Sequence, residues 1–266
     1  MNASTHDDVL AVAPAHSPGR LLRIYYLEAR CEFLRVLRTP GFAIPTLAFP
    51  LMFFLFFGVL FATGPHAQEQ AMYTLAGLGS FGVIGPGLFG FGVGFALDRG
   101  LGWLQVKRAS PMPPSAYLLA KVAMSMLFAL LVVVLMFSAA AALAHVSLGF
   151  DQWLILAVTL VLGAIPFCAM GLAIGSWTKP QAAPAVVNLL FMPMSFLSGL
   201  WLPLQFLPKF LQNLAVILPP YHLGRLAVGA IGLEKVDVLP HVLALAAFTV
   251  FFLLLARRGY RRSAAA

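Results

Sequence analysis

The chain has 266 residues, of which 61% are hydrophobic and 10% are charged, and its formal net charge is +8. An ordinary soluble domain carries about 25% charged residues, so this composition excludes a soluble fold and favours burial in a lipid bilayer. The length leaves no room for a separate soluble catalytic domain. We therefore expect one integral membrane domain over residues 20–262.

Residues 1–19 are polar and include Asp7, Asp8, Pro14 and Pro18. They lack the basic start and the apolar stretch of a cleavable signal peptide. We expect a disordered tail that stays attached to the membrane domain.

Residues 20–38 predict an amphipathic helix, because one helical face is apolar and the charged side chains occupy the others. The apolar face comprises Leu22, Tyr25, Tyr26, Ala29, Phe33, Val36 and Leu37. Such a helix is typical of the membrane interface, where it either anchors the chain to lipid or also offers a face to a cytoplasmic partner. Pro40 and Gly41 then mark the turn into the bilayer.

Six stretches are apolar enough for membrane spans, each of which needs about 20 helical residues. They are residues 42–62, 73–97, 117–144, 153–177, 185–201 and 238–256. None alternates apolar and polar residues as the strands of a membrane barrel do, so the predicted fold class is all-α. The fifth span is the shortest, and its ends are the least sharply marked.

Glycines recur in the second span. Gly82, Pro86, Gly90 and Gly94 follow one another at intervals of four residues and predict a groove of small residues for a neighbouring helix. That neighbour belongs either to the same chain or to a second copy. The span also contains two G-x-G-x-x-G patterns, but they do not lie between a strand and a helix, so they do not indicate nucleotide binding.

Residues 98–113, between the second and third spans, are basic and amphipathic, and Pro111 and Pro113 end the pattern. The segment predicts a short helix on the membrane surface. Trp103 in this helix is either a membrane-interface anchor or a contact for a soluble partner.

The basic residues are distributed unevenly between the two sides of the predicted membrane domain. All but three of the 17 lie before span one, between spans two and three, between spans four and five, or after span six. The exceptions are Lys209, Arg225 and Lys235. By the positive-inside rule, we expect both termini to be cytoplasmic. The expected location is the cell (inner or plasma) membrane. The positive charge then serves contact with anionic lipid, and no nucleic-acid partner is expected.

Ionisable side chains are scarce inside the spans: Asp98, Lys121 and His241 all lie near span ends. This disfavours transport driven by protons or sodium ions. The acids and histidines of the loops lack the spacing of a metal site or a catalytic triad. The chain also lacks the P-loop pattern G-x-x-x-x-G-K-[S/T], so we expect no catalytic, cofactor or metal site in it.

Several short motifs occur between and within the predicted spans: Leu37-Arg-Thr-Pro40, Phe49-Pro50, Asp98-Arg99, Gly102-Trp-Leu104, Ala109-Ser-Pro111, Phe196-Leu-Ser-Gly-Leu-Trp-Leu-Pro203, Phe206-Leu-Pro208 and Leu218-Pro-Pro-Tyr-His222. Together they resemble the membrane subunit, or permease, of ABC-2 type transporters, and the likeness runs from Leu21 to Arg262. The Ser198-Gly199 region is the most specific of these.

The resemblance implies that two permease copies, here expected as a homodimer, work with two separate ATPase subunits that bind the ATP and magnesium. It further implies that the loop after span two couples to the ATPase and that residues 202–230 form short re-entrant helices before the last span. Prolines at 203, 208, 219 and 220 suit such short helices. The expected coupling residues are Asp98, Arg99, Leu101, Trp103, Leu104, Lys107 and Arg108.

The expected function is export of a hydrophobic or amphipathic, lipid-like or drug-like substrate. Smooth apolar spans that are rich in Phe and Met favour such cargo over a bare ion. Two alternatives stay open: a membrane-embedded enzyme that modifies lipids, and a scaffold that transports nothing. A P-loop ATPase encoded beside this chain would distinguish the exporter from both.

Overall fold

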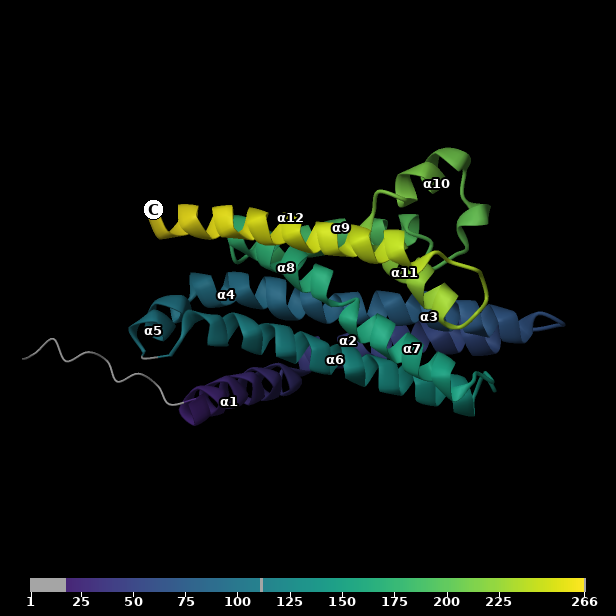
Figure 1. The fold of residues 1–266 in the computed structure, drawn as a ribbon, viewed down its shortest axis with the longest axis horizontal. Coiled ribbons are helices and arrows are strands. Elements are labelled where there is room, and N and C mark those ends of the chain that lie inside the picture. Colours follow the sequence, from purple (N-terminus) through teal and green to yellow (C-terminus); the bar gives the residue numbers. More distant parts are fainter. Residues whose placement is uncertain (1–17, 111, 266) are drawn as a thin grey trace, which may run out of the picture.

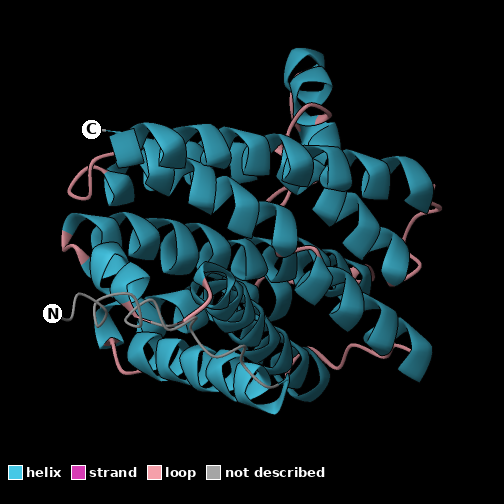
Figure 2. Ribbon diagram, turned by 60° about the vertical axis from the view of Figure 1, so that its left-hand side comes forward, coloured by secondary structure: helices cyan, strands magenta, loops and turns pink. Residues whose placement is uncertain are grey.

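A computed structural model describes residues 18–110 and 112–265. Within those residues the fold is a bundle of helices without a strand (Figure 2). The first half contains α1 (Pro18–Leu37), α2 (Pro40–Phe54), the π-helix η1 (Leu55–Leu60), α3 (Ala67–Gly85), the π-helix η2 (Pro86–Val93), α4 (Gly94–Gly100), α5 (Trp103–Ala109) and α6 (Pro114–Ala142). The second half contains α7 (Phe150–Leu162), α8 (Ile165–Trp177), α9 (Ala183–Leu197), the 3-10 helix η3 (Leu204–Phe206), α10 (Lys209–Ala215), α11 (Pro219–Ala230) and α12 (Val238–Ala265).

The two ends of the bundle differ. One end, which we call the α5 end, holds α5, the start of α1 and the C-terminus (Figure 1). The other, the α10 end, holds α10 and the connection from α11 to α12. The predicted tail is wrong at its boundary, because Pro18 and Gly19 already belong to α1; residues 1–17 lie outside the described residues.

Five helical segments are long and apolar enough to cross a membrane. They are Pro40–Leu60, Ala67–Gly100, Ser115–Ala142, Phe150–Trp177 and Val238–Gly259. Each overlaps a predicted span, and the second extends beyond its prediction at both ends. The predicted span 185–201 coincides with α9, whose 15 residues fall short of the roughly 20 that a perpendicular crossing needs. A sixth crossing therefore stays a prediction.

A glycine ends α9. Gly199 has φ +77°, in the left-handed region that favours glycine. Its N–H donates to the carbonyl of Phe196, and the N–H of Leu200 donates to the carbonyl of Ser195, which together form a Schellman motif. The chain then passes through η3 and α10, which projects from the bundle, and returns in α11, which packs against α3, α7 and α12 (Figure 1). The re-entrant character of these helices stays a prediction.

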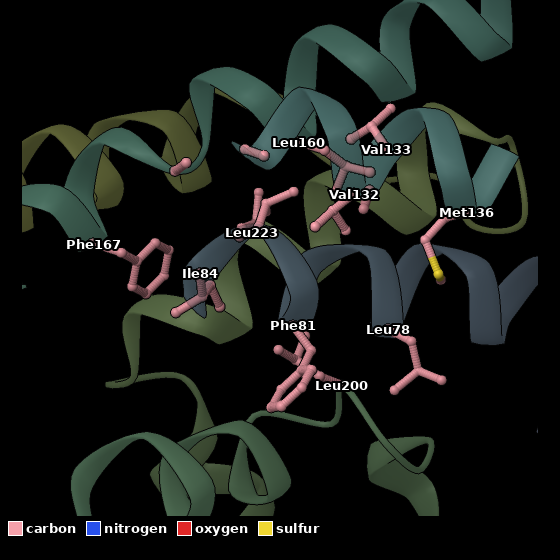
Figure 3. Close-up of a cluster of buried hydrophobic side chains, with 14 of the residues drawn as sticks. Leu78, Phe81, Ile84, Val132, Val133, Met136, Leu160, Phe167, Leu200 and Leu223 are labelled. Carbon is pink, nitrogen blue, oxygen red and sulfur yellow. The ribbon is translucent and has the colours of Figure 1, made fainter. Parts of the chain in front are cut away.

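The second span is the centre of the core. Leu78, Phe81 and Ile84 of α3 lie among side chains of α6, α7, α8 and α11, and all three are buried (Figure 3). In contrast, α12 buries few of its apolar side chains, and Phe251 and Leu254 are among those that it exposes. Exposure of such a large apolar surface to water would be unfavourable, whereas the acyl chains of a bilayer would cover it.

The backbones of η2 and α8 approach each other closely. A Cβ atom built on Gly92 would lie 2.7 Å from the Cα atom of Gly171, and one on Gly87 would lie 2.9 Å from the backbone nitrogen of Cys168. These glycines therefore let two helices meet backbone to backbone. Sequence analysis assigned neither Gly87 nor Gly92 to helix packing, although Gly171 and Gly175 of α8 form a G-x-x-x-G pattern.

The glycines chosen from the sequence face other helices of the same chain. A Cβ on Gly82 would lie 2.7 Å from a methyl group of Val132 in α6, and one on Gly94 would lie 3.2 Å from Lys121 Nζ. Gly90 lies against Met124 of α6 and Phe42 of α2. The neighbours of these three glycines are thus mainly side chains of α6.

Candidate functional site

Helix α1 lies along the first half of α6 rather than across the end of the bundle (Figure 1). The Tyr25 hydroxyl is 2.7 Å from Ser115 Oγ, and the Phe33 and Phe128 rings are 5.4 Å apart between centroids. The face turned inward matches the predicted apolar face only in part: Phe33 and Val36 pack into the bundle, but Glu32 is also buried and Leu22 is 72% exposed. The rotation of α1 is explained by the charges that it meets in the bundle.

Those charges form a compact group that we call the charge cluster: Glu32, Arg35, Asp98, Tyr117 and Lys121. Lys121 is fully buried, and its Nζ lies 2.6 Å from Glu32 Oε1 and 3.0 Å from Asp98 Oδ2. Arg35 donates to Asp98 Oδ1 at 2.8 Å and to Glu32 Oε1 at 2.7 Å. Tyr117 donates to Asp98 Oδ2 at 2.7 Å. Two carboxylates and two cations therefore balance each other, and of these four charged groups only Arg35 has substantial contact with solvent.

The charge cluster joins three helices, because α1, α4 and α6 each contribute a charged group. Breaking one member of such a buried group leaves an uncompensated charge, so the three helices are expected to move together. Arg35 is the member nearest to solvent. Partial burial lowers its pKa, but the contacts with Asp98 and Glu32 outweigh that effect and raise the pKa above its usual value.

Sequence analysis missed this cluster. It placed Asp98 and Lys121 near span ends and Glu32 on the polar side of an interfacial helix, each considered alone. A usable signal existed, since an ionisable residue bordering an apolar span requires a partner. Only the tertiary packing identifies which charges pair.

The short helix α5 is fastened to this end of the bundle. Lys107 pairs with Glu28 of α1, and its Nζ lies 4.7 Å from the centroid of the Tyr117 ring. Leu104 packs against the buried side chains of Phe91 and Phe95. The inward face of α5 thus has both ionic and apolar contacts.

Arg99 connects the same region to α8. Its guanidinium donates to the carbonyl oxygens of Ser176 and Thr178, each at 2.5 Å. The last carbonyls of a helix carry partial negative charge, so a cation stabilises them. Arg99 therefore ties the end of α4 to the end of α8.

Three apolar side chains of α5 and of the turn before it are exposed. Leu101 is 73% exposed, Trp103 is 52% exposed and Val106 is 61% exposed. The predicted coupling residues thus differ in their surroundings. Leu101 is mostly exposed, and Trp103 is half-exposed beside a cavity that Glu28 and Arg35 also line. Asp98, Arg99, Leu104 and Lys107 hold the segment to the bundle. The side chain of Arg108 lies outside the described part of the chain.

Comparison with known proteins identifies the class. Residues 25–231 match the family of ABC-2 type transporters, so the chain belongs to that family. It is also 27% identical over 247 residues to the Bacillus subtilis (strain 168) protein named "Putative transport permease YvfS". That match covers 92% of this chain and the whole of the relative. The protein is therefore a multi-pass membrane permease of the ABC-2 type.

Proposed function

We propose that this permease exports a hydrophobic or amphipathic substrate with energy from ATP that a separate subunit hydrolyses, and that the ATPase docks on α5. One observation carries the proposal: α5 and the turn before it expose Leu101, Trp103 and Val106, while the other face of α5 is fastened to the bundle. A few buried aromatic and apolar anchors dominate most protein interfaces. An exposed tryptophan on a firmly held helix suits such an anchor.

A displacement of α5 would be transmitted to several helices through direct contacts. Lys107 connects α5 to α1 through Glu28, and Arg99 connects the end of α4 to α8. The charge cluster joins α1, α4 and α6. Because buried, hydrogen-bonded charges resist separation, these connections favour movement of the helices as a unit. The ATPase would thus act on the membrane spans without any catalytic group in this chain.

The orientation supports the same assignment. The α5 end carries all the basic residues except Lys209, Arg225 and Lys235. If this end faces the cytoplasm of the cell membrane, as the positive-inside rule favours, a soluble ATPase has access to α5.

The apolar substrate is favoured by a groove of about 280 Å³ between α2, the second span and α9. Phe49, Phe81 and Phe191 line it, and Asn188 adds one amide. Its open side would accept an acyl chain or face a second copy of the permease. A homodimer is the arrangement that we propose.

The docking surface can be tested with the triple variant Leu101→Ala/Trp103→Ala/Val106→Ala. It should insert normally into membranes but lose co-purification with the P-loop ATPase co-expressed from the neighbouring reading frame. The matched control is Phe206→Ala/Phe210→Ala, which removes comparably exposed apolar side chains at the α10 end and should retain the ATPase.

Two results would contradict the proposal. Undiminished co-purification and substrate-stimulated ATP hydrolysis in the triple variant would remove α5 from the ATPase contact. Failure of the triple variant to insert, with a normal control, would instead assign Trp103 to membrane anchoring.

A further inference from the structure

A second cavity, of about 230 Å³, lies at the α10 end between α3, the end of α9 and α11. Its lining is mainly polar and includes Tyr73, Ser198, Tyr221, Arg225 and Glu234. Neither the ATPase contact nor the apolar groove involves these residues. The cavity is smaller than the roughly 300–1,000 Å³ of sites for drug-sized ligands, so it suits one polar group of a larger molecule.

Two polar atoms in the lining have no partner among the described residues. They are the hydroxyl oxygen of Ser198, a residue that is only 4% exposed, and Nε of Arg225. Buried polar atoms are nearly always hydrogen-bonded, because leaving one unpaired costs about 1–3 kcal/mol. Both groups can donate to an oxygen atom, and both belong to residues that line the same cavity.

The charges in the cavity are balanced. Arg225 Nη1 donates to Glu234 Oε2 at 2.5 Å, so an incoming group with a net charge would face an opposing charge as well as an attracting one. A carboxylate has about four acceptor positions, and the Arg225 bond uses one of them. Glu234 can therefore accept from a cationic group while Arg225 binds an anionic one.

The two charges also differ in depth. The Arg225 side chain is 29% exposed and that of Glu234 is 47% exposed, so the cation lies deeper and the carboxylate nearer the mouth. The Tyr221 ring, which also lines the cavity, offers a π-face to an ammonium group. This order matches a head group whose phosphate lies deeper in the cavity and whose ammonium lies nearer the mouth.

We propose that this cavity binds a zwitterionic phosphate–ammonium head group. The phosphate accepts from Arg225 Nε and the Ser198 hydroxyl, and the ammonium lies against Glu234 and Tyr221. The identification of that molecule as a transported amphipath rests on the proposed function, but the binding itself does not.

The test is isothermal titration calorimetry on the purified full-length permease in a maltoside detergent, without any ATPase. The probes are dihexanoyl-phosphatidylethanolamine, dihexanoyl-phosphatidylglycerol, which lacks the ammonium, and free O-phosphoethanolamine. We expect saturable binding of the ethanolamine lipid, weaker by about 10-fold or more in Arg225→Gln and by about fivefold in Ser198→Ala. The matched control Ser195→Ala removes a buried hydroxyl that bonds within α9 and lies outside the cavity lining, and it should bind as the wild type does.

Because Arg225→Gln removes an ion pair, Glu234→Gln gives a second test. It keeps the shape of the side chain and should abolish the preference for the ethanolamine lipid over the glycerol lipid. Equal binding of free phosphoethanolamine would support the zwitterion site and assign it to a soluble ligand instead of a lipid.

Identical isotherms for wild type, Ser198→Ala and Arg225→Gln would overturn the proposal, since the heat would then come from partition into detergent. Equal binding of the two lipids by the wild type would also overturn it. Neither result depends on ATPase docking at α5, so failure here is separable from failure of the proposed function.

Discussion

Replacement of Lys121 with methionine removes the ammonium group that lies between Glu32 and Asp98 while keeping a long, unbranched side chain. The two carboxylate side chains are 5% and 6% exposed, and they would then share only Arg35, which is 49% exposed. Truncation of one member of a buried charge group costs about 3–5 kcal/mol. Because Arg35 still contacts both acids, we expect about 3 kcal/mol, at the lower end of this range.

The assay is the apparent melting temperature of the detergent-purified permease, followed by size-exclusion chromatography after heating. For a chain of about this size, each kcal/mol lowers the melting temperature by about 2–4 °C, so Lys121→Met should lose roughly 6–12 °C. Lys209→Met, at an exposed position of α10, is the matched control and should melt as the wild type does.

A double-mutant cycle separates charge balance from packing. Glu32→Gln together with Lys121→Met removes one charge of each sign, so the double variant should be more stable than the sum of the single effects by at least about 1 kcal/mol. The reasoning is refuted if Lys121→Met melts within 2 °C (roughly 1 kcal/mol) of the wild type. Strictly additive single effects would likewise show that the two groups do not act as a pair.

Three further outcomes follow from the structure. Gly92→Ala should lose about 1–3 kcal/mol, measured as a lower melting temperature, because its Cβ would lie 2.7 Å from the α8 backbone, whereas Gly85→Ala, which meets no atom within 4 Å, should lose nothing. Burial and the neighbouring histidine of α12 lower the pKa of His222. The contribution of neutral His222 to stability is therefore present above about pH 6.5 and is lost as the pH falls through the pKa of the folded state. The melting temperature should decrease between pH 7.5 and 5, and it should decrease less in His222→Gln. Equal decreases in the two proteins would exclude His222 as the cause. Cysteines at Lys209 and Arg258, in a chain otherwise free of cysteine, should be labelled from outside intact cells only at the first position; labelling at the second would reverse the proposed orientation.

The features that were predicted correctly are mostly those that depend on residues close together in the sequence. Long apolar runs need no tertiary information to be recognised as helices of membrane-crossing length, and five predicted spans are confirmed in that sense. The family resemblance was also confirmed. It could be recognised from the sequence because each of its motifs is a contiguous stretch of residues. The shorter α9 was harder to judge, because Gly199 ends the helix inside an apolar run that continues to Trp201.

The contacts between distant segments were decided by the tertiary structure. Glu32, Asp98 and Lys121 stand far apart in the chain, and their pairing depends on α1 lying along α6 instead of across the bundle end. That choice placed the carboxylate of Glu32 inside and Leu22 outside, against the apolar pattern of the helix. A periodicity states which residues share a face, but only the partner helices determine which face is buried, because a buried charge is tolerated where an opposite charge meets it.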